Sequence, residues 1–133
     1  MPTNQYGIPT TLADNAGHHV LVLWLDGFPT AGDSQIWNWL REDYTEFTTR
    51  NTKIIIVTRQ STTANQQFSN RFEFFFDVLS DPDDQLITEL KSQLSGTTIP
   101  EFCLINPAGR VVKWSLGRPL KTALEDLLSY LDS

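Results

Sequence analysis

The sequence is short of cysteine, of basic residues and of long apolar runs. Its 133 residues include one cysteine, Cys103, which excludes an intrachain disulfide, a dithiol pair within this chain and a cysteine-rich zinc site. Ten basic residues face 16 acidic ones, so nucleic acid and anionic membranes are poor default partners. No apolar stretch approaches the ~18 residues that span a bilayer, and residues 1–15 lack the features of a signal peptide. We therefore expect a cytoplasmic protein with no membrane or nucleic-acid partner.

What the sequence does contain is enough apolar material for one compact core. Hydrophobic residues make up 40% of the chain, which is ordinary for a globular protein and too much for a disordered one. At this length we expect a single domain over residues 1–133, with an N-terminal extension and loop over 1–17 and the core over 18–133.

Strand and helix patterns alternate along the chain. Continuous apolar runs predict strands that are covered on both faces, and stripes at helical spacing predict the segments between them. The expected strands cover residues 20–25, 53–58, 74–79, 101–106 and 110–116. The expected helices cover residues 33–49, 61–70, 81–94 and 120–131. This order predicts an α/β fold in which a mixed, mostly parallel sheet has helices on both faces and ends in a hairpin and a helix.

Two local signals fix connections between these elements. Asp81 followed by Pro82 is typical of a helix N-cap with a proline in the first turn. Asn106-Pro-Ala-Gly109 predicts a tight turn between the last two strands, because proline presets one φ angle and glycine tolerates a positive one.

Four segments in this order resemble one known group of proteins. They are Thr11-Leu-Ala-Asp-Asn-Ala-Gly17, the strand of residues 20–25 with Trp24, Leu79-Ser-Asp-Pro-Asp83, and Ile99-Pro-Glu-Phe-Cys-Leu-Ile-Asn-Pro-Ala-Gly-Arg-Val-Val112. The chain resembles the thioredoxin-like superfamily, in particular its alkyl-hydroperoxide-reductase/thiol-specific-antioxidant (AhpC/TSA, peroxiredoxin) and TlpA-like branch. The resemblance implies a thioredoxin-like fold with a redox site in the loop of residues 26–33, after the first core strand.

Laid on the family's motifs, that loop contains no thiol. The two cysteine positions of the TlpA-like motif fall on Phe28 and Ala31, and the peroxidatic cysteine of peroxiredoxins falls on Gly32 or, with a shift of one residue, on Asp33. Pro100 stands where peroxiredoxins place an arginine, and it matches the proline that thioredoxins hold beside their active site. The resemblance therefore implies that the fold is kept and its thiol chemistry is lost.

The family also implies a shallow apolar groove that could bind extended peptide without a thiol. In this sequence the residues that would form it are Phe28, Pro29, Thr30, Ala31, Gly32, Asp33 and Pro100. We find no catalytic residue and no cofactor or metal motif, so we expect none of these.

Other reactive residues have simpler explanations. Cys103 is either a lone reactive thiol or a buried apolar residue, and its apolar neighbours favour burial. Asp33 is a general base, a metal ligand or a helix cap, and the cap is the simplest explanation. His18 and His19 precede the first strand and so lie about 20 Å from the loop at its other end, too far for a Ser–His pair.

Two further patterns suggest binding sites. Asp81-x-Asp83-Asp84 begins like a calcium loop, but Leu86 and Ser92 replace the glycine and glutamate that the motif needs. An excess of aromatic residues predicts core packing or an exposed patch for a partner or a second copy of the chain. These aromatic residues are Trp37, Trp39, Phe72, Phe74, Phe75 and Phe76.

The sequence thus leaves three functions open. The first is a redox-inactive binding or scaffold module with a protein or peptide partner. The second is a thiol-dependent oxidoreductase or peroxidase that uses Cys103 or a thiol on another subunit. The third is a non-redox ligand-binding domain that uses the same loop. A homodimer is compatible with each of them.

Overall fold

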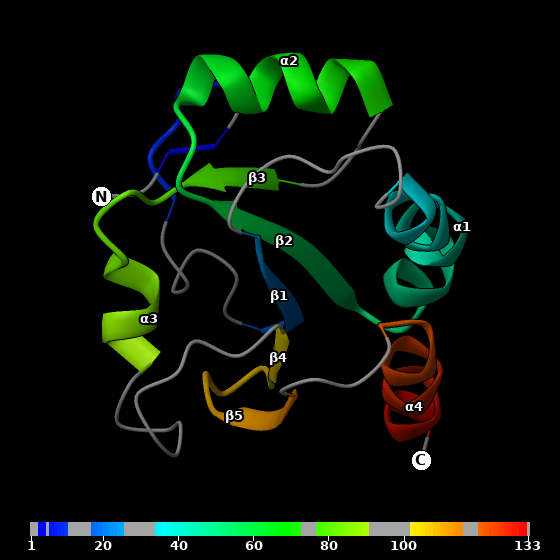
Figure 1. Ribbon diagram of the computed structural model, residues 1–133. Coiled ribbons are helices and arrows are strands. Elements are labelled where there is room, and N and C mark those ends of the chain that lie inside the picture. The colour runs from blue at the N-terminus through cyan, green and yellow to red at the C-terminus, as the bar shows by residue number, and fades with distance from the viewer. Residues whose placement is uncertain are drawn as a thin grey trace.

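The computed structural model shows a five-stranded sheet between layers of helices (Figure 1). It describes residues 3–4, 6–10, 17–25, 34–72, 77–90, 102–115 and 120–132. The strands are β1 (His19–Leu25), β2 (Thr52–Thr58), β3 (Asp77–Ser80), β4 (Phe102–Ile105) and β5 (Val111–Ser115). The helices are α1 (Ser34–Thr49), α2 (Thr62–Phe72), α3 (Gln85–Leu90) and α4 (Leu120–Asp132). No helix in these ranges is both long enough and apolar enough to cross a membrane.

The sheet has the mixed topology that the sequence predicts. Its strand order is β3-β2-β1-β4-β5, with β1, β2 and β3 parallel to one another and β4 and β5 antiparallel to their neighbours. Strand β1 therefore lies in the middle, between a parallel and an antiparallel partner. Its continuous apolar sequence fits this place, because a central strand is covered on both faces.

Alternate residues of the strands build two cores. One face of the sheet packs against α1 and α4, which lie together on one side in Figure 1, and the other face packs against α3. The buried residues of the first core are Leu21, Leu23, Phe47, Ile54, Ile56, Val78, Phe102, Leu104, Leu124 and Leu127. Those of the second are Val20, Val22, Ile55, Val57, Leu79, Leu86, Leu90, Cys103 and Ile105. The predicted helical stripes are confirmed at Phe47 of α1 and at Leu124, Leu127, Leu128 and Leu131 of α4.

Helix α2 covers the β3 edge of the sheet rather than a face (Figure 1). The Oγ of Ser61 accepts a hydrogen bond from the N–H of Ala64, which caps the helix where the sequence predicts its start. Among its described side chains, the helix buries two polar ones, Asn65 and Ser69.

Helix α3 begins later than the sequence predicts. Asp81 does cap it, because its carboxylate accepts hydrogen bonds from the N–H groups of Gln85 and Leu86 at 2.8 and 2.9 Å. The prediction that Pro82 lies in the first turn is wrong, since Pro82 is part of a separate turn and the helix starts at Gln85. The physical reason is Asp84, whose φ of 54° is left-handed and cannot continue a right-handed helix. The expected extension to Leu94 lies outside the described residues.

The predicted turn between β4 and β5 is confirmed. The Asn106 carbonyl accepts a hydrogen bond from Gly109, whose φ is 86°, and the Asn106 side chain accepts two more from the N–H groups of Ala108 and Arg110. The asparagine therefore holds both ends of the turn, and glycine supplies the positive φ.

Residues 3–4 and 6–10 form a small hairpin beside β3. The Oδ1 of Asn4 accepts hydrogen bonds from Tyr6 and Ile8, and Thr3 bridges to Pro9. Thr3 also bridges to Ser80, so the N-terminal segment packs against the edge strand.

Candidate functional site

The carboxyl end of β1 is where an open α/β sheet places its ligands. The chain leaves β1 at Leu25 and enters α1 at Ser34. It enters β4 at Phe102, which pairs with Leu23, so β4 also begins at this end of the sheet. The segments of residues 26–33 and 91–101 therefore both start or finish at the same end.

The predicted binding residues lie in those two segments. Phe28, Pro29, Thr30, Ala31, Gly32, Asp33 and Pro100 are all outside the described residues. The structure places Leu25 and Ser34 at the two ends of the first segment, and Leu90 and Phe102 at the two ends of the second. The groove and the cap at Asp33 stay predictions. The side chains of the aromatic residues expected to form an exposed patch also lie outside the description.

The described residues at this end form a hydrogen-bonded rim. Arg59 follows β2 and makes a bidentate ion pair with Asp84, with Nη2–Oδ2 and Nε–Oδ1 distances of 2.8 and 3.2 Å. Ser80 donates its hydroxyl hydrogen to the Gln60 carbonyl, and Asp81 uses its carboxylate to cap α3. The charges of the rim are thus engaged in holding β2, β3 and α3 together. Asp81 thus has a structural role as the cap of α3.

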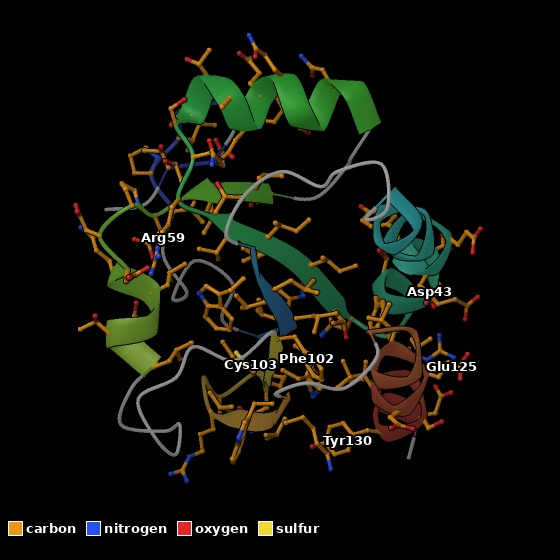
Figure 2. All side chains as sticks on the ribbon, viewed as in Figure 1. Asp43, Arg59, Phe102, Cys103, Glu125 and Tyr130 are labelled. Carbon is orange, nitrogen blue, oxygen red and sulfur yellow. The ribbon has the colours of Figure 1, made fainter. Side chains whose placement is uncertain are left out.

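Cys103 is the only thiol, and it lies inside the sheet. It sits on β4 opposite Val22 of β1 and Trp114 of β5, and its side chain is 0% exposed. Figure 2 shows it on the side of β4 that faces α3, whereas Phe102 points toward α4. Burial raises the pKa of the Cys103 thiol from its ordinary 9.0 to about 12. At pH 7 the thiol therefore stays protonated, so it is a very poor nucleophile in the folded protein.

The two histidines lie at the opposite end of the sheet. His18 hydrogen-bonds to the Asn51 side chain, and His19 opens β1 opposite Thr52. Partial burial lowers the pKa of His19. The length of β1 separates both rings from the loop after Leu25, as the sequence predicts, and their contacts are those of structural residues.

A cavity of about 320 Å³ opens at this same amino end of the sheet, between α1 and the start of β3. The residues that line it are Tyr44, Thr48, Thr52, Lys53, Ile54, Ile55 and Asp77. Sequence reasoning missed this site. The available signals were the polar Lys53 at the head of an apolar strand and Asp77 in a strand, where aspartate is unfavourable. Neither signal reveals that the two residues lie on neighbouring strands.

Comparison with known proteins agrees with this architecture. The sequence model of the AhpC/TSA family matches residues 1–114. No curated protein sequence matches the chain.

Several solved structures are similar along nearly the whole chain. The Xanthomonas campestris bacterioferritin comigratory protein, a protein studied for alkyl peroxide reduction, has a TM-score of 0.82 at 23% identity, covering 99% of this chain and 90% of that chain. A mutant of Xylella fastidiosa PrxQ has a TM-score of 0.82 at 20% identity, with 98% and 86% covered. The Mycobacterium tuberculosis peroxidoxin BcpB has a TM-score of 0.81 at 17% identity, with 98% and 90% covered. At these identities the similarity shows the thioredoxin-like fold and not a shared activity.

Proposed function

Because the chain belongs to the AhpC/TSA family and yet carries its single thiol inside the sheet, we propose that it is a redox-inactive member that acts by binding. One observation carries this proposal: Cys103 is fully buried on a core strand. Peroxide reduction by a thiol needs a thiolate that can reach the peroxide and become a sulfenic acid. Cys103 lacks both the exposure and the ionisation that this step requires.

The sequence of the loop supports the same proposal. Phe28, Ala31 and Gly32 occupy the positions at which the family resemblance places cysteines, and none of them can form a sulfenic acid. Asp33 cannot replace a peroxidatic thiolate for the same reason.

The direct test is a peroxidase assay. The protein is incubated with cumene hydroperoxide and dithiothreitol, and peroxide consumption is compared with a protein-free blank and with Cys103→Ser. We expect all three rates to be equal. A rate above the blank that disappears in Cys103→Ser would show instead a thiol peroxidase that uses Cys103.

A thiol on another subunit or partner is the remaining route to redox activity. Because such a thiol would have to come from a second protein, the assay is repeated with purified thioredoxin and thioredoxin reductase in place of dithiothreitol. We expect no NADPH oxidation beyond the blank, and sustained oxidation that needs this chain would contradict the proposal.

The proposed binding face is the loop of residues 28–33 together with Pro100, and the proposed partner is an extended, apolar peptide or protein segment. Peptides are selected by phage display against the wild-type protein and then measured against Phe28→Ser. We expect the substitution to weaken the selected peptides by roughly tenfold or more, which corresponds to about 1.4 kcal/mol. Tyr6→Ser is the matched control, because Tyr6 is a 62% exposed aromatic residue on the N-terminal hairpin. Equal loss in both variants, or in neither, would exclude the loop as the binding face.

A further inference from the structure

Strand β5 is the last strand of the sheet, in the order β3-β2-β1-β4-β5. Within the described part of the chain it pairs only with β4, and Figure 1 shows it at the lower end of the sheet with no labelled element below it. A strand at such an edge directs the N–H and C=O groups of alternate residues away from the sheet, where a further strand can pair with them. The irregularity in the β4–β5 ladder lies between Leu104 and Ile105, near the turn, so residues 113–115 keep regular pairing.

The two sides of β5 carry different chemistry. Lys113 pairs with Leu104 of the first core and therefore lies on the α4 side of the sheet. Its Nζ is 5.1 Å from the centre of the Tyr130 ring, and Figure 2 shows Tyr130 on the side of α4 toward β5. Trp114 pairs with Cys103 of the second core, so its side chain lies on the opposite side of the sheet. A strand added to this edge meets a cation on one side and an indole ring on the other.

The side chains that an added strand would meet are exposed. Trp114 is 44% exposed and Tyr130 is 36% exposed, which is unusual for large aromatic residues next to a core. Lys113 is exposed too, and it forms no ion pair with any residue in the described ranges. Aromatic residues of this kind are enriched in surfaces that bind other proteins.

The charge of this edge is opposite to that of the chain as a whole. Residues 110–121 contain four of the ten basic residues and none of the 16 acidic ones. Arg110 directly precedes β5, and Lys113 is its middle residue. Lysine on an edge strand deters partners of like charge, and an antiparallel pairing of two β5 strands about their centres would place the two Lys113 side chains opposite one another. An acidic strand would instead bring carboxylates to Lys113.

We propose that the β5 edge binds an extended acidic peptide segment as an added strand. Acidic residues at alternate positions of the segment face Lys113, and the apolar or aromatic residues between them face Trp114. Backbone hydrogen bonds to β5 hold the segment, and the two sets of side chains select its sequence. This site is independent of the binding face proposed above, because its determinants are on β5 and not in the loop of residues 28–33.

The test uses a capped peptide with the required alternation, Thr-Val-Glu-Phe-Glu-Val-Thr. It is added to the ¹⁵N-labelled protein, and amide shifts are followed by NMR. We expect saturable shifts at residues 111–115 at peptide concentrations below about 1 mM. The same peptide with lysine at both glutamate positions should bind at least roughly tenfold more weakly. The absence of saturable shifts, or equal binding of the two peptides, would overturn the proposal.

N-methylated peptides test the backbone pairing. In a strand that pairs along one edge, only every second residue directs its N–H toward the partner. The three central residues of the glutamate peptide are therefore N-methylated one at a time. We expect the loss of affinity to alternate along the peptide, roughly tenfold where the N–H faces β5 and much smaller where it faces away. Equal effects at all three positions would contradict an added strand.

Matched variants test the residues of the edge. Lys113→Glu should weaken the glutamate peptide by roughly tenfold or more and strengthen the lysine peptide, whereas Lys53→Glu, the same change at an exposed lysine of β2, should alter neither. Trp114→Ser should weaken both peptides, because they share the same apolar positions. The spectrum of each variant reports whether it folds. Unchanged binding in Lys113→Glu would overturn the proposal.

Two further measurements separate this proposal from its alternatives. Phe28→Ser, which tests the loop, should leave binding of the glutamate peptide unchanged, so that either proposal can fail without the other. Sedimentation of the protein alone should show no dimer that depends on this edge. A dimer that Trp114→Ser dissociates would overturn the proposal, because a second copy of the chain would then be what binds β5.

Discussion

Cys103 and Val22 are directly opposed across β4 and β1, and both side chains are completely excluded from solvent. The thiol therefore sits next to the central strand of the sheet, beneath α3. No reagent can reach the sulfur there without opening the second core. Its chemistry should accordingly report on the stability of the fold and not on an active site.

The first prediction concerns the pH dependence that Cys103 gives to stability. Its pKa is raised in the folded state, so above the ordinary value of 9.0 the unfolded chain releases a proton that the folded chain keeps until about pH 12. The Cys103 contribution is thus constant below pH 9, and stability falls as pH rises through this window, by up to about 1.4 kcal/mol per pH unit. Urea unfolding between about pH 8 and 10.5 measures the slope.

Cys103→Ala is the control for this prediction. Lysines and tyrosines titrate in the same window, but they do so in both proteins, so the difference between the two slopes isolates the thiol. Identical slopes, or rapid alkylation of folded Cys103 by iodoacetamide at pH 7, would contradict the burial on which the proposed function rests.

The second prediction concerns Asp81, which is 2% exposed and accepts hydrogen bonds from the N–H groups of Gln85 and Leu86. Asp81→Ala should lower the free energy of unfolding by about 1–3 kcal/mol, because it leaves both amides without this acceptor. Asp83→Ala is the matched control, since Asp83 is an exposed residue of the preceding turn, and it should change stability by less than about 0.5 kcal/mol. Chemical denaturation measures both, and equal losses would refute the assigned cap.

The fold could be predicted where the determinants are local. The apolar runs of β1 and β2 predict strands covered on both faces, and the turn at Asn106 and Gly109 follows from the conformations that those residues favour. The start of α3 could not be predicted, because Asp81 and Pro82 are also the residues of a turn. The choice between the two readings is set by the left-handed conformation of Asp84, which is in turn held by its ion pair with Arg59.

The sites were less accessible to sequence reasoning than the fold. Burial of Cys103 followed from its apolar neighbours, which is local information. The placement of Lys53 and Asp77 on neighbouring strands depends instead on the pairing of Ile55 with Asp77, 22 positions further along the chain. A register of this kind is set by the packing of β3 and α2 against β2. No periodic pattern of apolar residues in the sequence predicts it.

The third prediction concerns Gly109, whose φ of 86° lies in the left-handed region. Apart from Gly109 itself and its two chain neighbours, nothing lies within 4 Å of the place where a Cβ would stand, so the penalty for a side chain comes from the backbone conformation. Gly109→Ala should lower the free energy of unfolding by about 1–2 kcal/mol, and Gly109→Asn should cost less, because asparagine tolerates this conformation. Thermal unfolding of the two variants measures the difference. An alanine variant as stable as the wild type would show that the turn relaxes.

The last prediction concerns the buried polar pair beneath α2. Thr58 is 1% exposed and donates its hydroxyl hydrogen to the Oδ1 of Asn65 at 2.7 Å, while the buried Nδ2 of Asn65 has no hydrogen-bond partner among the residues that the structure describes. Thr58→Val would leave the other polar atom of Asn65 unpaired as well, and it should lower the free energy of unfolding by about 1–3 kcal/mol. Adding Asn65→Leu removes the side-chain amide that Thr58→Val leaves without a partner.

The double variant Thr58→Val/Asn65→Leu should therefore lose less stability than the sum of the single variants, with a coupling of about 0.5–3 kcal/mol. Urea unfolding of the wild type, the two single variants and the double variant gives the four free energies of unfolding that the double-mutant cycle needs. Because both side chains are replaced by apolar groups of similar size, a strictly additive result would mean that the Thr58–Asn65 hydrogen bond contributes nothing to joining α2 to the sheet.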